Sequence, residues 1–301
     1  MRGTSGSDTT RSPSAPIVVG VDGSASALAA VGWAAAECAR HHVPLRLVHG
    51  FMLPASGYPE MLINATEARH AIEQQARDWL TEAAATARAA APDVKITTEV
   101  LCCGAAGLLI EESRKARLVV VGSRGLGTVT GLLVGSTAVA LAAHGHSPVV
   151  VVRGMAVPDG PVVVGVDGSP TSEAALAFAF EAASTRGVAL TALMTSQDFT
   201  VDSAYHVSRI AIDWAQVEED ERRLLAQRLA GWQEKYPDVE VRRVVLRDRP
   251  ARALMRYGAE AQLLVVGSHG HGGFAGMLLG STSQALVHHA PCPLAIVRPP
   301  K

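Results

Sequence analysis

The chain repeats itself, and this repeat constrains the fold more than any other feature. Four segments return at a constant offset of 145 residues: IVVGVDGS as VVVGVDGS (17–24 and 162–169), LVVVGSRG as LLVVGSHG (118–125 and 263–270), LLVGST as MLLGST (132–137 and 277–282), and SPVVVVR as CPLAIVR (147–153 and 292–298). Two copies that keep one register over this length predict two domains of one fold.

The length of 301 residues fits two domains of about 150 residues each. We expect them at residues 16–154 and 161–299, joined by the short, turn-rich segment Gly154–Gly160. Residues 1–15 are polar and lack the apolar region of a secretory signal, so they are predicted to form a disordered tail.

Within each copy, apolar runs alternate with helical stretches. In the first copy the runs at 16–22, 45–51, 94–102, 117–123 and 148–153 are predicted strands, and 24–42, 67–90, 107–116 and 136–145 are predicted helices. Val- and Leu-rich runs without polar alternation are typical of strands buried on both faces. The sequence therefore predicts two tandem α/β domains, each a doubly wound, Rossmann-like, five-stranded parallel sheet with helices on both faces.

Composition excludes several classes of protein. The chain is 48% hydrophobic and has a formal net charge of −1, so it lacks the basic field of a nucleic-acid-binding protein. No apolar run reaches the ~18 residues of a membrane helix, and we expect a soluble, cytoplasmic protein without nucleic-acid or membrane partners. The adjacent Cys102 and Cys103 are either small buried apolar residues in a reducing compartment or a redox pair.

A glycine-rich pattern follows the fourth predicted strand of each copy. It reads Gly122-x2-Gly125-x9-Gly135-Ser136-Thr137, and in the second copy Gly267-x2-Gly270-x9-Gly280-Ser281-Thr282. Glycines let backbone amides approach an anion, and the helix that begins at Ser136 or Ser281 offers unpaired N–H groups to a phosphate. Ordinary helix capping is the alternative interpretation. The lysine of a Walker loop is missing from both copies.

These motifs resemble the universal stress protein family, and the chain is most similar to its tandem, actinobacterial-type members. The glycine spacing looks like the family's ATP-binding signature, and VGVDGS, LVHGF and CPLAIVR look like its other conserved segments. The resemblance covers about residues 16–299. It implies that the closing strands of the two copies pair into a pseudo-dimer within one chain, and that two chains form a homodimer.

The resemblance also implies one ATP in each domain, accompanied by Mg²⁺. The residues that match the family's nucleotide site are Asp22, Gly50, Gly122, Gly125, Gly135, Ser136 and Thr137 in the first copy, and Asp167, Thr195, Gly267, Gly270, Gly280, Ser281 and Thr282 in the second. Gly50 and Thr195 match the family position whose backbone contacts the adenine. Because the two residues differ, the resemblance implies that the adenine contacts differ between the domains. Arg124 and His269 occupy equivalent positions, either as phosphate contacts or as exposed loop residues.

Three functions are compatible with this pattern. The first is an ATP-binding regulator or sensor in a stress or dormancy response, read by a regulatory protein partner, with at most weak hydrolysis or autophosphorylation. The second is a slow ATPase or an ATP-using enzyme similar to the adenine-nucleotide hydrolases; their Ser-Gly-Gly-x-Asp-Ser type of loop is replaced here by VDGSAS and VDGSPT. The third is a scaffold with vestigial sites.

Overall fold

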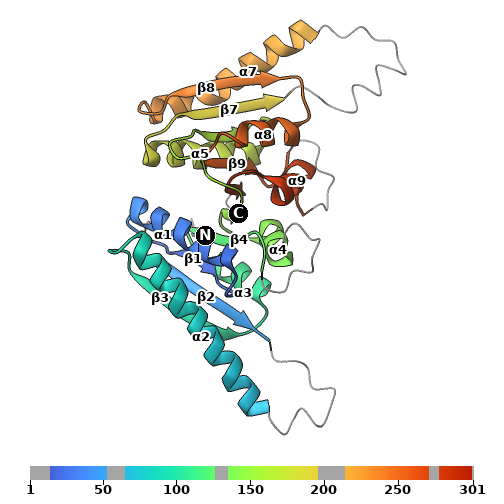
Figure 1. The fold of residues 1–301 in the computed structure, drawn as a ribbon. Helices are drawn as coiled ribbons and strands as arrows, with labels where there is room; N and C mark the ends of the chain where they lie inside the picture. Colours follow the sequence, from blue (N-terminus) through green and yellow to red (C-terminus); the bar gives the residue numbers. More distant parts are fainter. Residues whose placement is uncertain (1–13, 53–64, 126–134, 196–213, 271–277, 300–301) are drawn as a thin grey trace, which may run out of the picture.

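The molecule is built on one continuous sheet. The computed structural model describes residues 14–52, 65–125, 135–195, 214–270 and 278–299. Their strands form a ten-stranded sheet in the order β3-β2-β1-β4-β5-β10-β9-β6-β7-β8 (Figure 1). Of the predicted tail at 1–15, residues 1–13 lie outside the described residues.

The first half of the sheet has the strand order 3-2-1-4-5, with all neighbours parallel. Its strands are β1 (Ile17–Gly20), β2 (Leu45–Phe51), β3 (Ile96–Cys102), β4 (Leu118–Gly122) and β5 (Val149–Val152). Its helices are α1 (Ala25–His41), α2 (Ala65–Ala90), α3 (Ala105–Glu112) and α4 (Ser136–His144).

The second half repeats this arrangement. Its strands are β6 (Val162–Gly165), β7 (Leu190–Thr195), β8 (Val241–Leu246), β9 (Leu263–Gly267) and β10 (Leu294–Val297). The helices described there are α5 (Pro170–Arg186), α7 (Trp214–Lys235), α8 (Pro250–Gly258) and α9 (Ser281–His289). The predicted α/β fold of two doubly wound, five-stranded parallel sheets is thereby confirmed.

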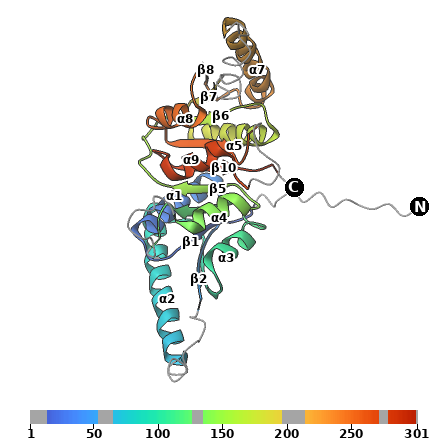
Figure 2. The ribbon, with the colours of Figure 1, turned by 90° about the vertical axis from the view of Figure 1, so that its right-hand side faces the viewer.

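The two halves join through their closing strands. β5 and β10 pair antiparallel, with Val150 opposite Ala295, whereas every other strand pair in the sheet is parallel. Figures 1 and 2 show the halves on either side of this seam, with α2 and α7 at the far ends of the molecule. The pairing satisfies both apolar edges within one chain, and it confirms the predicted pseudo-dimer.

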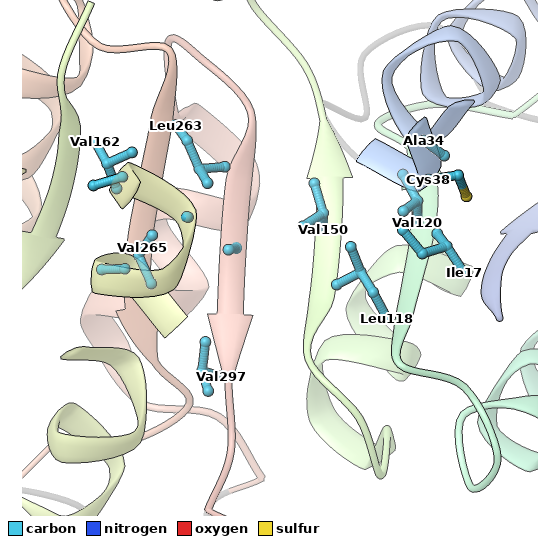
Figure 3. Close-up of a cluster of buried hydrophobic side chains, with 14 of the residues drawn as sticks. Ile17, Ala34, Cys38, Leu118, Val120, Val150, Val162, Leu263, Val265 and Val297 are labelled. Atoms are coloured by element: carbon cyan, nitrogen blue, oxygen red, sulfur yellow. The ribbon is translucent and has the colours of Figure 1, made fainter. Parts of the chain in front are cut away.

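Both faces of the sheet are covered by helices. One core packs α1, α2, α5 and α7 against the sheet, and the other packs α3, α4, α8 and α9. Val19 belongs to the first core and Val18 to the second, and both are fully buried. This explains why the strands lack polar alternation. Figure 3 shows the first core extending across the seam, from Val120 and Val150 to Val265 and Val297.

One predicted helix has the wrong bounds. The sequence pattern placed it at 107–116, but α3 runs from Ala105 to Glu112. The chain tightens after that residue, because Arg114 N–H donates to Glu111 and Lys115 N–H donates to Glu112, each three residues back. Ser113 Oγ also donates to the Ile110 carbonyl, which competes with continuation of the helix.

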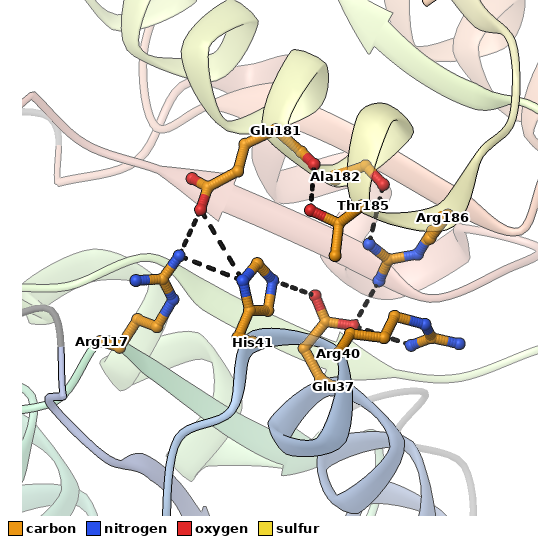
Figure 4. A network of polar contacts seen from close by, with 8 residues as sticks. All are labelled: Glu37, Arg40, His41, Arg117, Glu181, Ala182, Thr185 and Arg186. Carbon is orange, nitrogen blue, oxygen red and sulfur yellow. Dashed lines mark hydrogen bonds and ion pairs between the residues drawn. The ribbon is translucent and has the colours of Figure 1, made fainter. Parts of the chain in front are cut away.

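A polar network, buried at Glu37 and Arg186, connects the halves on the α1/α5 side (Figure 4). Glu37 Oε2 lies 2.6 Å from Arg186 Nη2 of the other half, and Glu37 Oε1 lies 3.1 Å from His41 Nε2. Arg117, just before β4, bonds Glu181 of α5. Ion pairs between charged side chains, as well as apolar packing, therefore hold the two halves together.

No helix in the described part of the chain is long and apolar enough to cross a membrane.

Candidate nucleotide site

A cavity of about 320 Å³ lies at the carboxyl ends of β1, β2 and β4. This is the edge at which open parallel sheets bind ligands. All seven residues predicted in the first half line it: Asp22, Gly50, Gly122, Gly125, Gly135, Ser136 and Thr137. The structure therefore brings together residues that are spread over more than a hundred positions of the sequence.

Asp22 sits in a tight turn between β1 and α1. The turn depends on Gly23, whose φ of +79° is in the left-handed region. Asp22 Oδ1 accepts hydrogen bonds from Ser24 N–H (3.1 Å) and Ser24 Oγ (2.7 Å). A side chain at Gly125 would collide with Asp22 Oδ2, so the carboxylate and the glycine loop are in direct contact.

The loop after β4 is tied to the start of α1. A Cβ at Gly122 would lie 2.6 Å from the carbonyl carbon of Ser26, so only glycine allows this approach. The hydroxyl of Ser26 donates to the carbonyl of Arg124, and Ser24 Oγ lies 3.1 Å from the same carbonyl oxygen. Sequence reasoning missed both serines as site residues. Their signal was a hydroxyl at the same two positions of the second copy, Ser169 and Thr171.

The opposite wall of the cavity is the start of α4. Gly135 caps this helix without a side-chain hydrogen bond, and its N–H donates to the Ser123 carbonyl at 3.0 Å. Ser136 and Thr137 are the first residues of the helix and line the cavity. The positive end of the helix dipole is thus presented to the cavity, which favours an anion.

The other end of the cavity is apolar. Gly50 is packed so closely that a Cβ there would lie 2.8 Å from the Cys103 carbonyl oxygen. The neighbouring lining residues share small or aliphatic side chains: Val48, Ala105, Leu108, Leu109 and Val121. This division into an apolar end and an anion-binding end is what a nucleotide needs.

His49 ties β2 to the end of β1, and sequence reasoning did not single it out. Its ring is buried, and Nδ1 lies 2.7 Å from the Val21 carbonyl, which can only accept a hydrogen bond. Nδ1 therefore donates. The ring also lies 5.4 Å from that of Trp79, which packs against Gly23. His49 thus holds the ends of β1 and β2 in register beside the cavity.

The second half repeats the turn after its first strand. Ser169 N–H donates to Asp167 Oδ1 at 2.9 Å, and the hydroxyl of Thr171 donates to the His269 carbonyl. A side chain at Gly270 would collide with Asp167 Oδ2, as at the equivalent place in the first half.

The helix start is repeated too. Gly280 caps α9 without a side-chain hydrogen bond, its N–H donates to the Ser268 carbonyl at 2.8 Å, and Ser281 and Thr282 open the helix. Gly267 packs against Thr171, and Thr195 is the last residue of β7. The contacts thus group Asp167, Gly267, Gly270 and Gly280, while Thr195 stands at the carboxyl end of the strand beside β6.

The charged residues that line the first cavity are Asp22 and Arg124. Arg124 lines the cavity with an exposed side chain. Burial lowers the pKa of Arg153, at the end of β5, and the nearby charge of Arg124 lowers that pKa further. Among the described residues, no group of three His, Cys, Asp or Glu side chains could hold a metal ion.

Together these features define a tandem, doubly wound α/β protein with a glycine-lined cavity at the carboxyl edge of its sheet. The family model of the universal stress protein family matches residues 14–153 and again residues 160–298. The chain belongs to this family.

Known relatives agree with this assignment. A universal stress protein of Mycolicibacterium smegmatis is 44% identical over 297 residues, covering 94% of this chain and 97% of the relative. One of Mycobacterium tuberculosis is 40% identical over 306 residues, covering 95% of each. The solved structure of a universal stress protein from Archaeoglobus fulgidus has the same fold, with a TM-score of 0.66 at 20% identity and coverage of 95% of this chain and 98% of that one.

Proposed function

We propose that this protein binds one ATP in each half and acts as a regulator whose nucleotide state is read by a partner protein in a stress or dormancy response. The observation that carries the proposal is a cavity lined by Asp22, by the glycines after β4 and by the start of α4, which has no side-chain cap. The same constellation recurs around Asp167 and Gly280, which supports a second site.

The apolar end suits a purine base. Leu108, Leu109 and Val48 provide aliphatic contact, and the close approach of the chain at Gly50 leaves backbone groups of β2 near the base edge. Backbone donors and acceptors at such an edge distinguish one base from another. In the second half the equivalent edge ends at Thr195, so we expect unequal affinities at the two sites.

The polar end suits a polyphosphate. The backbone N–H groups of Ser136 and Thr137 stand at the positive end of α4, beside the Gly135 N–H that the Ser123 carbonyl already takes, and Arg124 adds a positive side chain at the rim. Mg²⁺ prefers oxygen ligands and keeps several waters, so phosphate oxygens with at most one carboxylate, Asp22, fit it. When bound, the ion neutralises phosphate charge in a site that has no loop lysine.

A binding role is favoured over fast catalysis. Hydrolysis needs a positioned water, a base and charge stabilisation at the γ-phosphate. The carboxylate of Asp22 accepts hydrogen bonds from Ser24 N–H and Ser24 Oγ, which favours a structural role in the turn over the role of a general base. Homodimerisation remains a prediction. Since β5 and β10 already pair with each other, a dimer of chains needs a different surface.

The test is to denature freshly purified protein, identify the released nucleotide and count it per chain, followed by titration with Mg-ATP. About two ATP per chain supports the proposal, and ADP alone favours the slow ATPase. If the purified protein contains no nucleotide and takes up no Mg-ATP, the proposed function is contradicted.

Two glycine variants assign the sites. Gly125→Val places a side chain against Asp22 Oδ2, and Gly270→Val does the same against Asp167 Oδ2, so each should remove one bound ATP. The matched control is Gly107→Ala on α3, where an added Cβ meets no atom within 4 Å. It should retain both nucleotides.

A further inference from the structure

Two arginines related by the repeat cross the seam between the halves. Arg153 follows β5, and its Nη1 donates to the Val287 carbonyl of α9; Arg298 follows β10, and its Nη2 donates to the Ala143 carbonyl of α4. Each guanidinium therefore enters the C-terminal turn of a helix that belongs to the other half. A positive group is favoured there by the helix dipole.

The same two helices begin at the glycine sites. α4 starts after Gly135 and α9 after Gly280, and each is nine residues long. A helix of that length is a rod of about 13 Å. Each of these two helices therefore extends from the anion-binding end of its own site to an arginine of the opposite half.

Arg298 makes a second contact that involves the second site directly. The nitrogen that bonds the Ala143 carbonyl also donates to the Leu278 carbonyl at 2.8 Å, two residues before Gly280. One guanidinium thus joins the end of α4 to the segment that leads into the second glycine site. In the described part of the chain, the buried Nε atoms of Arg298 and Arg153 have no hydrogen-bond partner. The two guanidinium groups are therefore held by the bonds from their Nη atoms to the carbonyls.

Arg153 is linked to the first site by strand pairing, because its neighbour Val152 pairs with Gly122, which lines the first cavity. Burial lowers the pKa of Arg153, and the positive charge of Arg124, which lines the first cavity, lowers it further. A phosphate bound beside Arg124 would offset that repulsion and strengthen the bond from Arg153 to the Val287 carbonyl.

From these contacts we propose that Arg153 and Arg298 couple the two nucleotide sites of one chain, so that a nucleotide in one half raises the affinity of the other half. The inference rests on the proposed function, since it concerns the same two sites. An anion at the N-terminus of α4 and a guanidinium at its C-terminus stabilise the same helix orientation, and that orientation also sets the position of the Leu278 carbonyl. Coupling of this kind is reciprocal between the sites. Arg298 acts here as a positioning residue.

The experiment is a calorimetric titration of the full chain with Mg-ATP. Gly125→Val reports the second site alone, Gly270→Val reports the first site alone, and the unsubstituted chain reports both. We expect each site to bind about fivefold more tightly when the other is filled. Arg298→Gln should keep two sites and reduce this factor to about one.

A conservative variant and a control separate coupling from folding. Arg298→Lys keeps the charge but loses the planar guanidinium geometry, so it should also reduce the coupling factor. If Arg298→Gln fails to fold, Arg298→Lys replaces it in the experiment. Arg222→Gln on α7, with an exposed side chain, should leave the factor unchanged.

Two filled sites with independent affinities in the unsubstituted chain would overturn the inference. A factor that survives in every folded Arg298 variant would overturn it equally, and both results would leave the proposed function standing. If the unsubstituted chain binds no Mg-ATP at all, the proposed function fails, and the inference fails with it.

Discussion

Glu37 of α1 and Arg186 of α5 form an ion pair of 2.6 Å across the seam, with side chains that are only 3% and 4% exposed. Burial alone would raise the pKa of Glu37, but the hydrogen bond from His41 and the charges of Arg186 and Arg40 outweigh it and hold the pKa below its ordinary value. The carboxylate is therefore charged in the folded protein, and its charge is matched by a residue of the other half.

Removing either partner of this pair should strongly destabilise the protein. Glu37→Met or Arg186→Met leaves an uncompensated buried charge, and we expect a loss of about 3 to 5 kcal/mol in the free energy of unfolding by urea. The double variant should recover most of that loss, because an apolar pair of similar volume replaces the ion pair. As a control, Arg222→Met breaks an exposed pair with Glu218 and should cost about 0.5 kcal/mol or less. Single losses below 1 kcal/mol would contradict this account.

The contribution of Glu37 should depend on pH in one direction. Because its folded pKa lies below the ordinary value of 4.5, the stabilisation is fully present above that value and is lost as the pH falls through the folded pKa. The difference in unfolding free energy between the unsubstituted chain and Glu37→Gln should therefore be constant from pH 7 to 5 and shrink below pH ~4. A difference that grows on acidification would show that the carboxyl is protonated in the folded protein.

Two glycines with positive φ should respond differently to alanine. Gly187 ends α5 at φ +65°, with no atom within 4 Å of an added Cβ, so Gly187→Ala should cost only the left-handed strain of about 1 to 2 kcal/mol. Gly23 has φ +79°, and its added Cβ would also collide with the Trp79 indole, so Gly23→Ala should cost about 2 to 5 kcal/mol. Urea unfolding measures both, and equal losses would mean that Trp79 moves aside freely.

The four cysteines should separate into two reactivity classes. Burial, with the charge of Glu37 added for Cys38, raises the pKa of Cys38 to about 12, and burial raises that of Cys292 to about 12. Cys102 and Cys103 are exposed at the end of β3, so the prediction that they are buried apolar residues is wrong. Ellman's reagent at pH 8 should therefore modify two thiols rapidly and the other two only after denaturation. A Cys102→Ser/Cys103→Ser variant should show no rapid phase; rapid modification of all four thiols would refute the assigned burial.

Much of the fold was readable from the sequence because buried parallel strands and the repeat leave strong local signals. The apolar run at 45–51 coincides with β2, and the glycine spacing located the ends of β4 and β9 beside the starts of α4 and α9. The seam could be predicted from the apolar closing strands and the family resemblance. The bounds of α3 could not, because local hydrogen bonds around Ser113 decide where that helix ends.

The residues that join the halves could not be found in the same way. Glu37 and Arg186 are 149 positions apart, and nothing in the pattern of either helix pairs them. The repeat does not help, since the positions equivalent to Glu37 and Arg186 are Ala182 and His41, and the network is asymmetric. Arg153 and Arg298 are visible as equivalents, but their carbonyl partners are not.

By itself the sequence determined two copies of a doubly wound domain and placed an aspartate and a glycine-rich loop at the sheet edge of each, because strand burial and backbone freedom are local properties. Only the tertiary structure decided how those copies meet and which charges lie between them. The antiparallel pairing of β5 with β10 brings the C-terminal ends of α1 and α5 together on one face and places an arginine of each half against the last helix of the other. Contacts of that kind depend on the relative placement of whole elements, which no local pattern of residues specifies.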